Sequence, residues 1–175
     1  IKQSLNQINR YPEGSCFYLK ERLAQRLKLK PQNLLFGNGS DELIDIIIKT
    51  LVGIDEEVIT AKTTFLEYEI ITKVNGRKVK TVPLTNFKYD LEAIKDKINK
   101  KTKVIFIANP NNPTGTYLNA KEVERFLKGL PSHLIVVFDE AYNEFVDCAD
   151  FPDTEKYLFS KNIIILRTFS KVYGL

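Results

Sequence analysis

Short runs of β-branched residues alternate with longer amphipathic segments along this chain. The apolar runs predict strands at residues 33–36, 58–60, 78–84, 104–108, 134–138 and 163–166. The intervening segments predict helices, because their apolar residues recur at helical spacing, as Leu19, Leu23 and Leu27 do before Pro31. Strands separated by crossover helices form a parallel sheet, so we expect an α/β fold with a mostly parallel sheet flanked by helices.

Polar residues mark the expected helix ends. Ser, Asp and Asn side chains accept hydrogen bonds from first-turn N–H groups, and Gly readily adopts the conformation that follows a helix. The expected boundaries are a cap at Ser40 for a helix to residue 51, a helix over 65–74 closed by Asn75 and Gly76, a start at Asp90, and a capping box of Asn119 and Glu122 for a helix to residue 130. Asn and Pro residues at 109–115 predict a rigid loop.

Polar clusters follow four of the expected strands. They are the segments 37–42, 109–115, 139–142 and 168–171. Ligands of an open parallel sheet bind beyond the carboxyl ends of its strands, where loops and helix starts converge. The four clusters together therefore predict one ligand site at that edge.

Each cluster alone also has an ordinary structural interpretation. Gly39 and Ser40 at a helix start can bind a phosphate or can form only a turn and a cap. Asp139 can cap a helix or pair with a lysine, and Tyr142 can be a packing residue. Lys171 by itself is typical of a solvated surface lysine. Only their shared position at strand ends favours a site.

Composition restricts the class of protein. The chain has 175 residues, 43% hydrophobic and 27% charged, which is typical of one globular domain. A net charge of +4 comes from dispersed basic and acidic residues, which argues against a nucleic-acid partner. Cys16 and Cys148 match no metal or redox spacing and His133 lies in a predicted turn, so we expect no metal site.

Two further expectations concern the whole protein. No segment approaches the roughly 20 apolar residues of a membrane span, and the isolated cysteines fit a reducing, cytoplasmic setting. The chain begins at Ile1 and contains no Met, so we expect it to be a piece of a longer protein.

Three motifs identify a family. In chain order they are Asn112-Pro113-Thr114-Gly115, Asp139-Glu140-Ala141-Tyr142 and Thr168-Phe169-Ser170-Lys171. Together they resemble the fold-type I aminotransferases that depend on pyridoxal 5'-phosphate (PLP). Within that family, residues 10–14, 37–42 and 167–175 are most similar to the histidinol-phosphate aminotransferases.

The resemblance implies an aspartate aminotransferase-like fold, with residues 1–175 as the large PLP-binding domain. By this resemblance we expect three parts of the family's fold to be missing from the chain: the N-terminal arm, a phosphate-binding arginine a few residues after Lys171, and the C-terminal small domain, whose arginine holds the substrate carboxylate or phosphate. We therefore expect the chain alone to be inactive or nearly so.

The resemblance also implies roles at the reacting end of the cofactor. Lys171 is expected to hold PLP as a Schiff base and then to act as the base that moves the substrate's Cα proton. Asp139 is expected to pair with the pyridine nitrogen and keep it protonated. Asn112 and Tyr142 are expected to donate hydrogen bonds to the ring's phenolic oxygen.

Further implied roles concern the phosphate and the ring face. The phosphate is expected on the amides that follow Gly39, those of Ser40 and Asp41, with help from the hydroxyls of Thr168 and Ser170. Phe65 occupies the position of the aromatic ring that stacks on the pyridine, although a core role remains open. The usual proline two residues before it is Thr63 here. Tyr11 matches a tyrosine that reaches the phosphate of the neighbouring subunit, which implies a homodimer with shared sites.

The reaction implied is ping-pong amino transfer between L-histidinol phosphate and 2-oxoglutarate, a step of histidine biosynthesis. The cofactor motifs do not distinguish this from an aromatic aminotransferase or a phosphothreonine decarboxylase of the same fold. A noncatalytic nucleotide- or phosphate-binding module that uses only residues 37–40 is a different interpretation. An acidic ribose ligand at the usual spacing would favour that module, and none follows. A fragment with only a structural or dimerising role also remains open.

Overall fold

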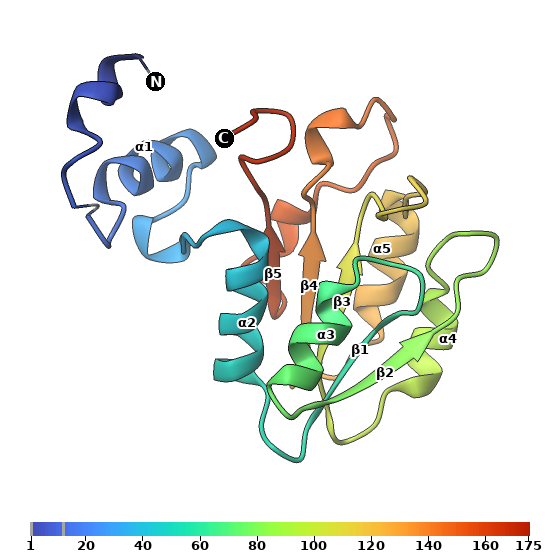
Figure 1. Ribbon diagram of the computed structural model, residues 1–175. Coiled ribbons are helices and arrows are strands. Elements are labelled where there is room, and N and C mark those ends of the chain that lie inside the picture. The colour runs from blue at the N-terminus through green and yellow to red at the C-terminus, as the bar shows by residue number, and fades with distance from the viewer. Residues whose placement is uncertain (1, 12) are drawn as a thin grey trace. The chain divides into compact units, whose positions relative to one another are not determined.

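The computed structural model describes residues 2–11 and 13–175 (Figure 1). The chain divides into two compact units, the first ending at Gly37 and the second formed by Asn38–Leu175. Each unit is described separately below. None of the helices in the described residues is long and apolar enough to cross a membrane.

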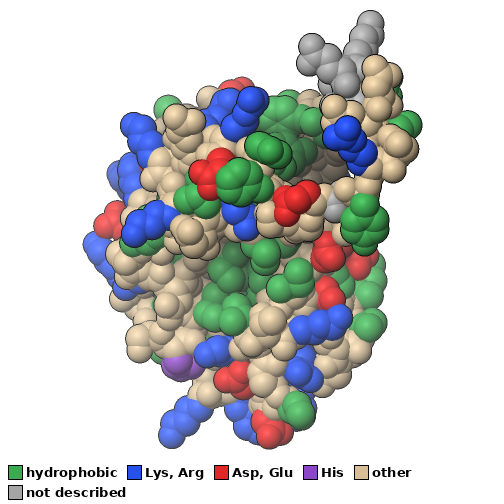
Figure 2. All heavy atoms as spheres, turned by 90° about the vertical axis from the view of Figure 1, so that its left-hand side faces the viewer, with side chains coloured by type: hydrophobic (Ala, Val, Ile, Leu, Met, Phe, Trp, Pro, Cys, Tyr) green, Lys and Arg blue, Asp and Glu red, His purple; other side chains and the backbone are tan. Residues whose placement is uncertain are grey.

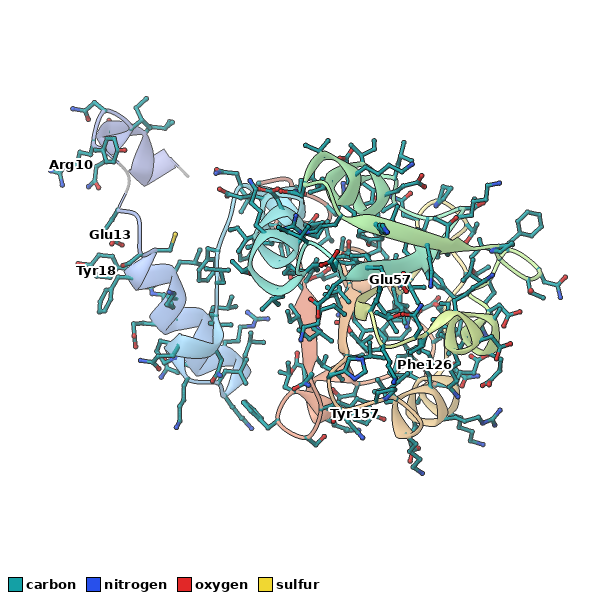
Figure 3. The ribbon with its side chains drawn as sticks, turned by 90° about the horizontal axis from the view of Figure 1, so that it is seen from below. Arg10, Glu13, Tyr18, Glu57, Phe126 and Tyr157 are labelled. Carbon is teal, nitrogen blue, oxygen red and sulfur yellow. The ribbon has the colours of Figure 1, made fainter. Side chains whose placement is uncertain are left out.

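The first unit is helical. Its elements are the 3₁₀ helix η1 (Lys2–Gln7), the helix α1 (Phe17–Leu27) and the 3₁₀ helix η2 (Pro31–Asn33). The Glu13 carboxylate accepts hydrogen bonds from the backbone N–H groups of Ser15 (2.8 Å) and Phe17 (2.9 Å), so it satisfies donors at the start of α1 (Figure 3). The helix predicted before Pro31 is confirmed. Pro12, part of the motif at 10–14, lies outside the described residues.

The strand predicted at residues 33–36 is wrong. Pro31 instead begins η2, because its fixed φ suits the first position of a helical turn. The Asn33 side chain accepts a hydrogen bond from the backbone N–H of Lys30 at 3.2 Å and closes that turn. Leu34 is extended, but residues 34–36 pair with no strand among the described residues.

The second unit contains a sheet of five parallel strands in the order β2-β1-β3-β4-β5. The strands are β1 (Glu57–Ala61), β2 (Lys78–Val82), β3 (Thr102–Ala108), β4 (Ile135–Asp139) and β5 (Ile163–Leu166). In this order the chain changes direction across the sheet between β1 and β3. The all-parallel α/β fold confirms the predicted class.

Four α-helices cover the two faces of this sheet, α2 and α3 on one and α4 and α5 on the other (Figures 1 and 3). They are α2 (Gly39–Leu51), α3 (Glu67–Val74), α4 (Leu91–Lys97) and α5 (Ala120–Lys128). Short 3₁₀ helices η3 (Asn143–Phe145) and η4 (Thr154–Tyr157) lie between β4 and β5 in the chain. The capping box of Asn119 and Glu122 forms as predicted, with both hydrogen bonds present.

The core lies between the sheet and these helices. The central strands β3 and β4 are almost entirely buried, which explains their continuous apolar sequences. On α5, Val123, Phe126 and Leu127 are buried at helical spacing, and Figure 3 shows Phe126 directed into the interior. Tyr68, Phe106 and Phe138 are among the largest fully buried side chains. His133, which was predicted to lie in a turn, is exposed.

Charged side chains are scattered over the surface. Figure 2 shows basic and acidic side chains interspersed among uncharged ones on the face that it presents. Several form ion pairs within helices, such as Lys49 with Asp45 at 2.6 Å and Lys128 with Glu124 at 2.9 Å. Exposed pairs of this kind contribute little to stability.

Candidate active site

A cavity of about 270 Å³ opens at the carboxyl ends of the strands, beside the point where the strand order changes direction. Small-molecule sites usually start at about 300 Å³, so one small ligand suits it. Its walls come from the start of α2 and from the loops after β1, β3, β4 and β5. The lining residues are Gly39, Ser40, Asp41, Phe65, Tyr68, Ala108, Pro110, Asn112, Asp139, Ala141, Tyr142, Ser170 and Lys171.

Asp139, the last residue of β4, supplies a buried carboxylate to this cavity. Its side chain accepts hydrogen bonds from the Tyr68 hydroxyl at 2.6 Å and from the Ala141 backbone N–H at 3.1 Å. Burial raises the pKa of Asp139 above its usual range, and these two hydrogen bonds partly offset that rise. Among the described residues no lysine or arginine forms an ion pair with it. A cationic group on a ligand would therefore find a matching carboxylate here.

Lys171 supplies the amine. It follows β5 in an irregular segment, and its Nζ lies 5.7 Å from the centre of the Tyr142 ring. In the same segment the hydroxyls of Thr168 and Ser170 are 2.7 Å apart, and the Ser170 N–H donates to the Thr168 hydroxyl at 3.2 Å. Ser170 lines the cavity, whereas Thr168 lies next to it through that hydrogen bond.

The start of α2 suits an anion, whereas the Asp139 carboxylate suits a cation. The predicted cap at Ser40 is wrong: Ser40 is the second residue of the helix, and the preceding Asn38 makes no side-chain cap hydrogen bond. Asn38 instead donates from its backbone and side chain to Glu42. Gly39 has φ 76°, a value that favours glycine. The first-turn N–H groups of a helix lack partners within the helix, and the residues that carry them here, Gly39, Ser40 and Asp41, line the cavity.

Phe65 and Asn112 reach the cavity from two loops that are bonded to each other. Phe65 precedes α3, which begins two residues later than predicted. Asn111 connects the loops: it accepts from the Thr64 hydroxyl at 2.8 Å, and its amide donates to the Thr63 carbonyl at 3.2 Å. The stiffness expected of the Asn-Pro loop therefore comes partly from these contacts.

Tyr68 is the cavity residue that sequence reasoning missed. Its ring is fully buried, stacks on Phe106 (4.9 Å between centres, 7° between planes) and meets Phe65 edge-on at 5.5 Å. Its hydroxyl donates to Asp139, so one side chain contacts two of the predicted site residues. The sequence does carry a signal for Tyr68: it follows Phe65 by three residues, and in the helix predicted over 65–74 both side chains lie on the same face.

We expect the substitution Tyr68→Phe to lower the free energy of unfolding by about 1–3 kcal/mol, because Asp139 loses a hydrogen bond while it stays buried. The pKa of Asp139 should rise further, since that hydrogen bond lowers it. Denaturant unfolding and infrared titration of the carboxyl group would measure the two effects.

A matched control for this substitution is Tyr89→Phe. The Tyr89 hydroxyl is also buried, and it contacts Thr64 at 2.7 Å and the Ala108 N–H at 3.1 Å rather than Asp139. Burial raises the pKa of Tyr89 to about 12. Both variants should lose stability, and an equal change of the Asp139 titration in both would contradict the role given to Tyr68.

Tyr11, another predicted site residue, belongs to the first unit, where its side chain is exposed. The remaining predicted residues belong to the second unit and, with Thr168 at the margin, line this cavity. An amine, a buried carboxylate, an aromatic ring and a helix start then face a common space. This set suits a flat ligand that has a basic ring nitrogen at one end and an anionic group at another.

A parallel α/β sheet with this arrangement at its carboxyl edge defines a domain of the aminotransferase type, and the chain belongs to the family of class I and II aminotransferases, whose model matches residues 2–175. It is 44% identical to the histidinol-phosphate aminotransferase of Caldicellulosiruptor saccharolyticus, with 100% of this chain and 49% of the relative covered. It is 41% identical to that of Moorella thermoacetica, with coverage of 100% and 46%.

Solved structures agree with the sequence relatives. The crystal structure of histidinol-phosphate aminotransferase from Sinorhizobium meliloti in complex with pyridoxal-5'-phosphate matches with a TM-score of 0.91 at 30% identity, over 99% of this chain and 48% of that chain. The chain thus spans about half the length of the curated relatives it matches.

Proposed function

We propose that this chain is the large cofactor-binding domain of a PLP-dependent aminotransferase that acts on L-histidinol phosphate and 2-oxoglutarate in histidine biosynthesis. The observation that carries the proposal is the meeting of Lys171, Asp139 and the start of α2 in one cavity. Histidinol phosphate is taken from the name of the relatives, histidinol-phosphate aminotransferases at 44% and 41% identity, and 2-oxoglutarate from the family resemblance of the motifs.

The charges around the cavity suit PLP. The buried Asp139 carboxylate would pair with a protonated ring nitrogen, and the first residues of α2, which line the same cavity, would offer N–H groups to a phosphate. When bound, PLP supplies an electron-accepting ring that stabilises negative charge at the substrate's Cα. The roles that follow belong to the residues of this chain.

Lys171 would act at the reacting end. Its Nζ would hold the cofactor covalently and, once freed, would take and return the proton of the substrate's Cα. The Asp139 carboxylate, which is buried and held by Tyr68 and Ala141, would keep the ring nitrogen protonated. Asn112 and Tyr142 would hydrogen-bond the ring's phenolic oxygen.

The phosphate end and the ring face use other residues. The amides that follow Gly39, those of Ser40 and Asp41, would bind the phosphate, and the hydroxyls of Ser170 and Thr168 would add donors. The Asp41 carboxylate would have to turn away, since two anions at one place repel each other. Phe65 would cover the face of the ring.

We also propose a cytoplasmic homodimer in which Tyr11 of each subunit contributes to the site of the other. The two substrates react in turn at this site, the first leaving its amino group for the second. The chain, which spans 49% of one relative, should turn over poorly alone, because the family resemblance assigns the substrate carboxylate to a further domain.

Borohydride reduction tests the proposal directly. The full-length protein should absorb visible light when PLP is added, and reduction followed by peptide mapping should place the cofactor on Lys171. The amino-donor half-reaction should also run faster with histidinol phosphate than with phenylalanine. A saturated protein with Lys171 unmodified would refute the cofactor proposal, whereas a preference for phenylalanine would refute only the substrate.

A further inference from the structure

An ion pair with one buried partner lies just outside the site, where β4 ends at Asp139 and β5 ends before the segment that carries Lys171. Asp139 and Leu166 are partners in the β4–β5 register, and the Glu140 N–H donates to the Leu166 carbonyl at 2.9 Å. The next residues, Glu140 and Arg167, are therefore neighbours. Because side chains alternate along a strand, Glu140 points away from the cavity that Asp139 faces.

Glu140 is held at both oxygens. Its side chain is 1% exposed, and one oxygen accepts from the Arg167 Nε at 3.1 Å and from its Nη2 at 2.7 Å. The other oxygen accepts from the buried Thr154 hydroxyl on η4. Arg167 also approaches Glu155 at 3.3 Å. The pair thus joins three segments: the end of β4, η4 and the end of β5.

The segment that carries Lys171 has little other support within the described second unit. Residues 169–175 are exposed and have no regular structure. Within the segment the Gly174 N–H donates to the Lys171 carbonyl and the Leu175 N–H to the Phe169 carbonyl, and one long hydrogen bond reaches a distant part of the chain, from the Tyr173 hydroxyl to the Glu144 carboxylate at 3.4 Å. Arg167 lies two residues before this segment and is bonded to the buried carboxylate of Glu140.

We propose that Glu140 and Arg167 are positioning residues, whose ion pair fixes the Lys171 segment at a set distance from Asp139. This inference rests on the proposed function, because it concerns the two groups that hold opposite parts of the cofactor. A catalytic site needs its groups held within about 0.5 Å of their productive positions. Beyond the ends of β4 and β5 the regular hydrogen bonds of the sheet end, and a salt bridge between the two strand ends can hold the segments there.

The structure offers a matched control at the amino ends of the strands, opposite the end that carries the cavity. Glu57 begins β1, is buried, and pairs with Lys80 at 2.7 Å while accepting from the Thr102 hydroxyl at 2.9 Å (Figure 3). Like Glu140, it is bonded to one cation and one threonine hydroxyl, and it also accepts from the Asn99 side-chain amide at 2.8 Å. It lies at the amino ends of the strands, away from the cavity.

The test compares Glu140→Gln with Glu57→Gln in the full-length protein. Both should lower the unfolding midpoint, because each removes a buried carboxylate from a half-exposed cation. In the unloaded protein, only Glu140→Gln should speed hydrogen exchange of the amides of 168–171. In the loaded protein, only Glu140→Gln should weaken PLP binding, by roughly ten-fold, and shift the pH midpoint of the visible absorbance band.

Arg167 variants keep the test decisive if Glu140→Gln does not fold. Arg167→Lys retains the charge and should recover part of the PLP affinity that Arg167→Gln loses. Equal PLP affinity, absorbance and amide exchange in the Glu140 and Glu57 variants, or in the two Arg167 variants, would overturn the inference. If the wild-type protein binds no PLP, the proposed function fails, while amide exchange in the unloaded protein still decides the positioning role.

Discussion

Replacing Lys171 with Ala should lower kcat for histidinol phosphate and 2-oxoglutarate by about 10²–10⁴-fold or more. The alanine lacks the amine that binds the cofactor covalently and moves the Cα proton, and the loss of a general base alone gives a reduction of that size. Folding should be nearly unchanged, because Lys171 is exposed and forms no ion pair among the described residues.

Steady-state turnover and mass spectrometry after borohydride reduction measure this effect. The variant should gain no cofactor mass, whereas Lys128→Ala should behave as the wild type. Lys128 ends α5 in an exposed pair with Glu124, so its loss removes a charge far from the chemistry. Wild-type turnover and labelling in the Lys171 variant would place the amine elsewhere.

Most of the fold could be predicted because its signals are local and agree with one another. The strand 163–166 has the predicted bounds, and the helix over 120–128 begins at the predicted capping box. In both, apolar periodicity and end signals point to the same structure. The strand at 33–36 failed because Pro31 favours a helical turn and the short apolar run after it has no partner.

The candidate site could be predicted in part for a different reason. Lys171 and Asp139 occur in motifs whose residues are adjacent in sequence, so a resemblance can identify them. Tyr68 and Arg167 act through contacts between segments 71 and 27 residues apart, with Asp139 and Glu140. No local pattern specifies such a partner. Only the register of β4 and β5 shows that Glu140 and Arg167 meet.

The substitution Asp139→Asn should have opposite effects on activity and on stability. Without the carboxylate, the ring nitrogen of the cofactor loses the charge that keeps it protonated, and kcat should fall by roughly 10²–10³-fold, as when one preorganised electrostatic contact is removed. The unloaded variant should be as stable as the wild type or more so at neutral pH. An amide can still accept from Tyr68 without the cost of a buried charge.

The pH dependence of that stability has a definite sign. Folding raises the pKa of Asp139 through burial, so the wild type binds this proton more tightly when folded. Its stability relative to the Asn variant should be greatest below the pKa of the unfolded state. It should then fall as the pH rises through the pKa of the folded state.

Asp90→Asn provides the opposite sign. The Asp90 side chain accepts from the Ala93 N–H at the start of α4, and this hydrogen bond lowers the pKa of Asp90. The wild type should therefore gain stability over Asp90→Asn as the pH rises through these values, and turnover should not change. Denaturant unfolding of the unloaded proteins between about pH 3 and 7 measures both curves. The same slope for both variants would show that Asp139 is not held in a buried, charge-disfavouring environment, and would remove the reason for assigning it to a cationic ring nitrogen.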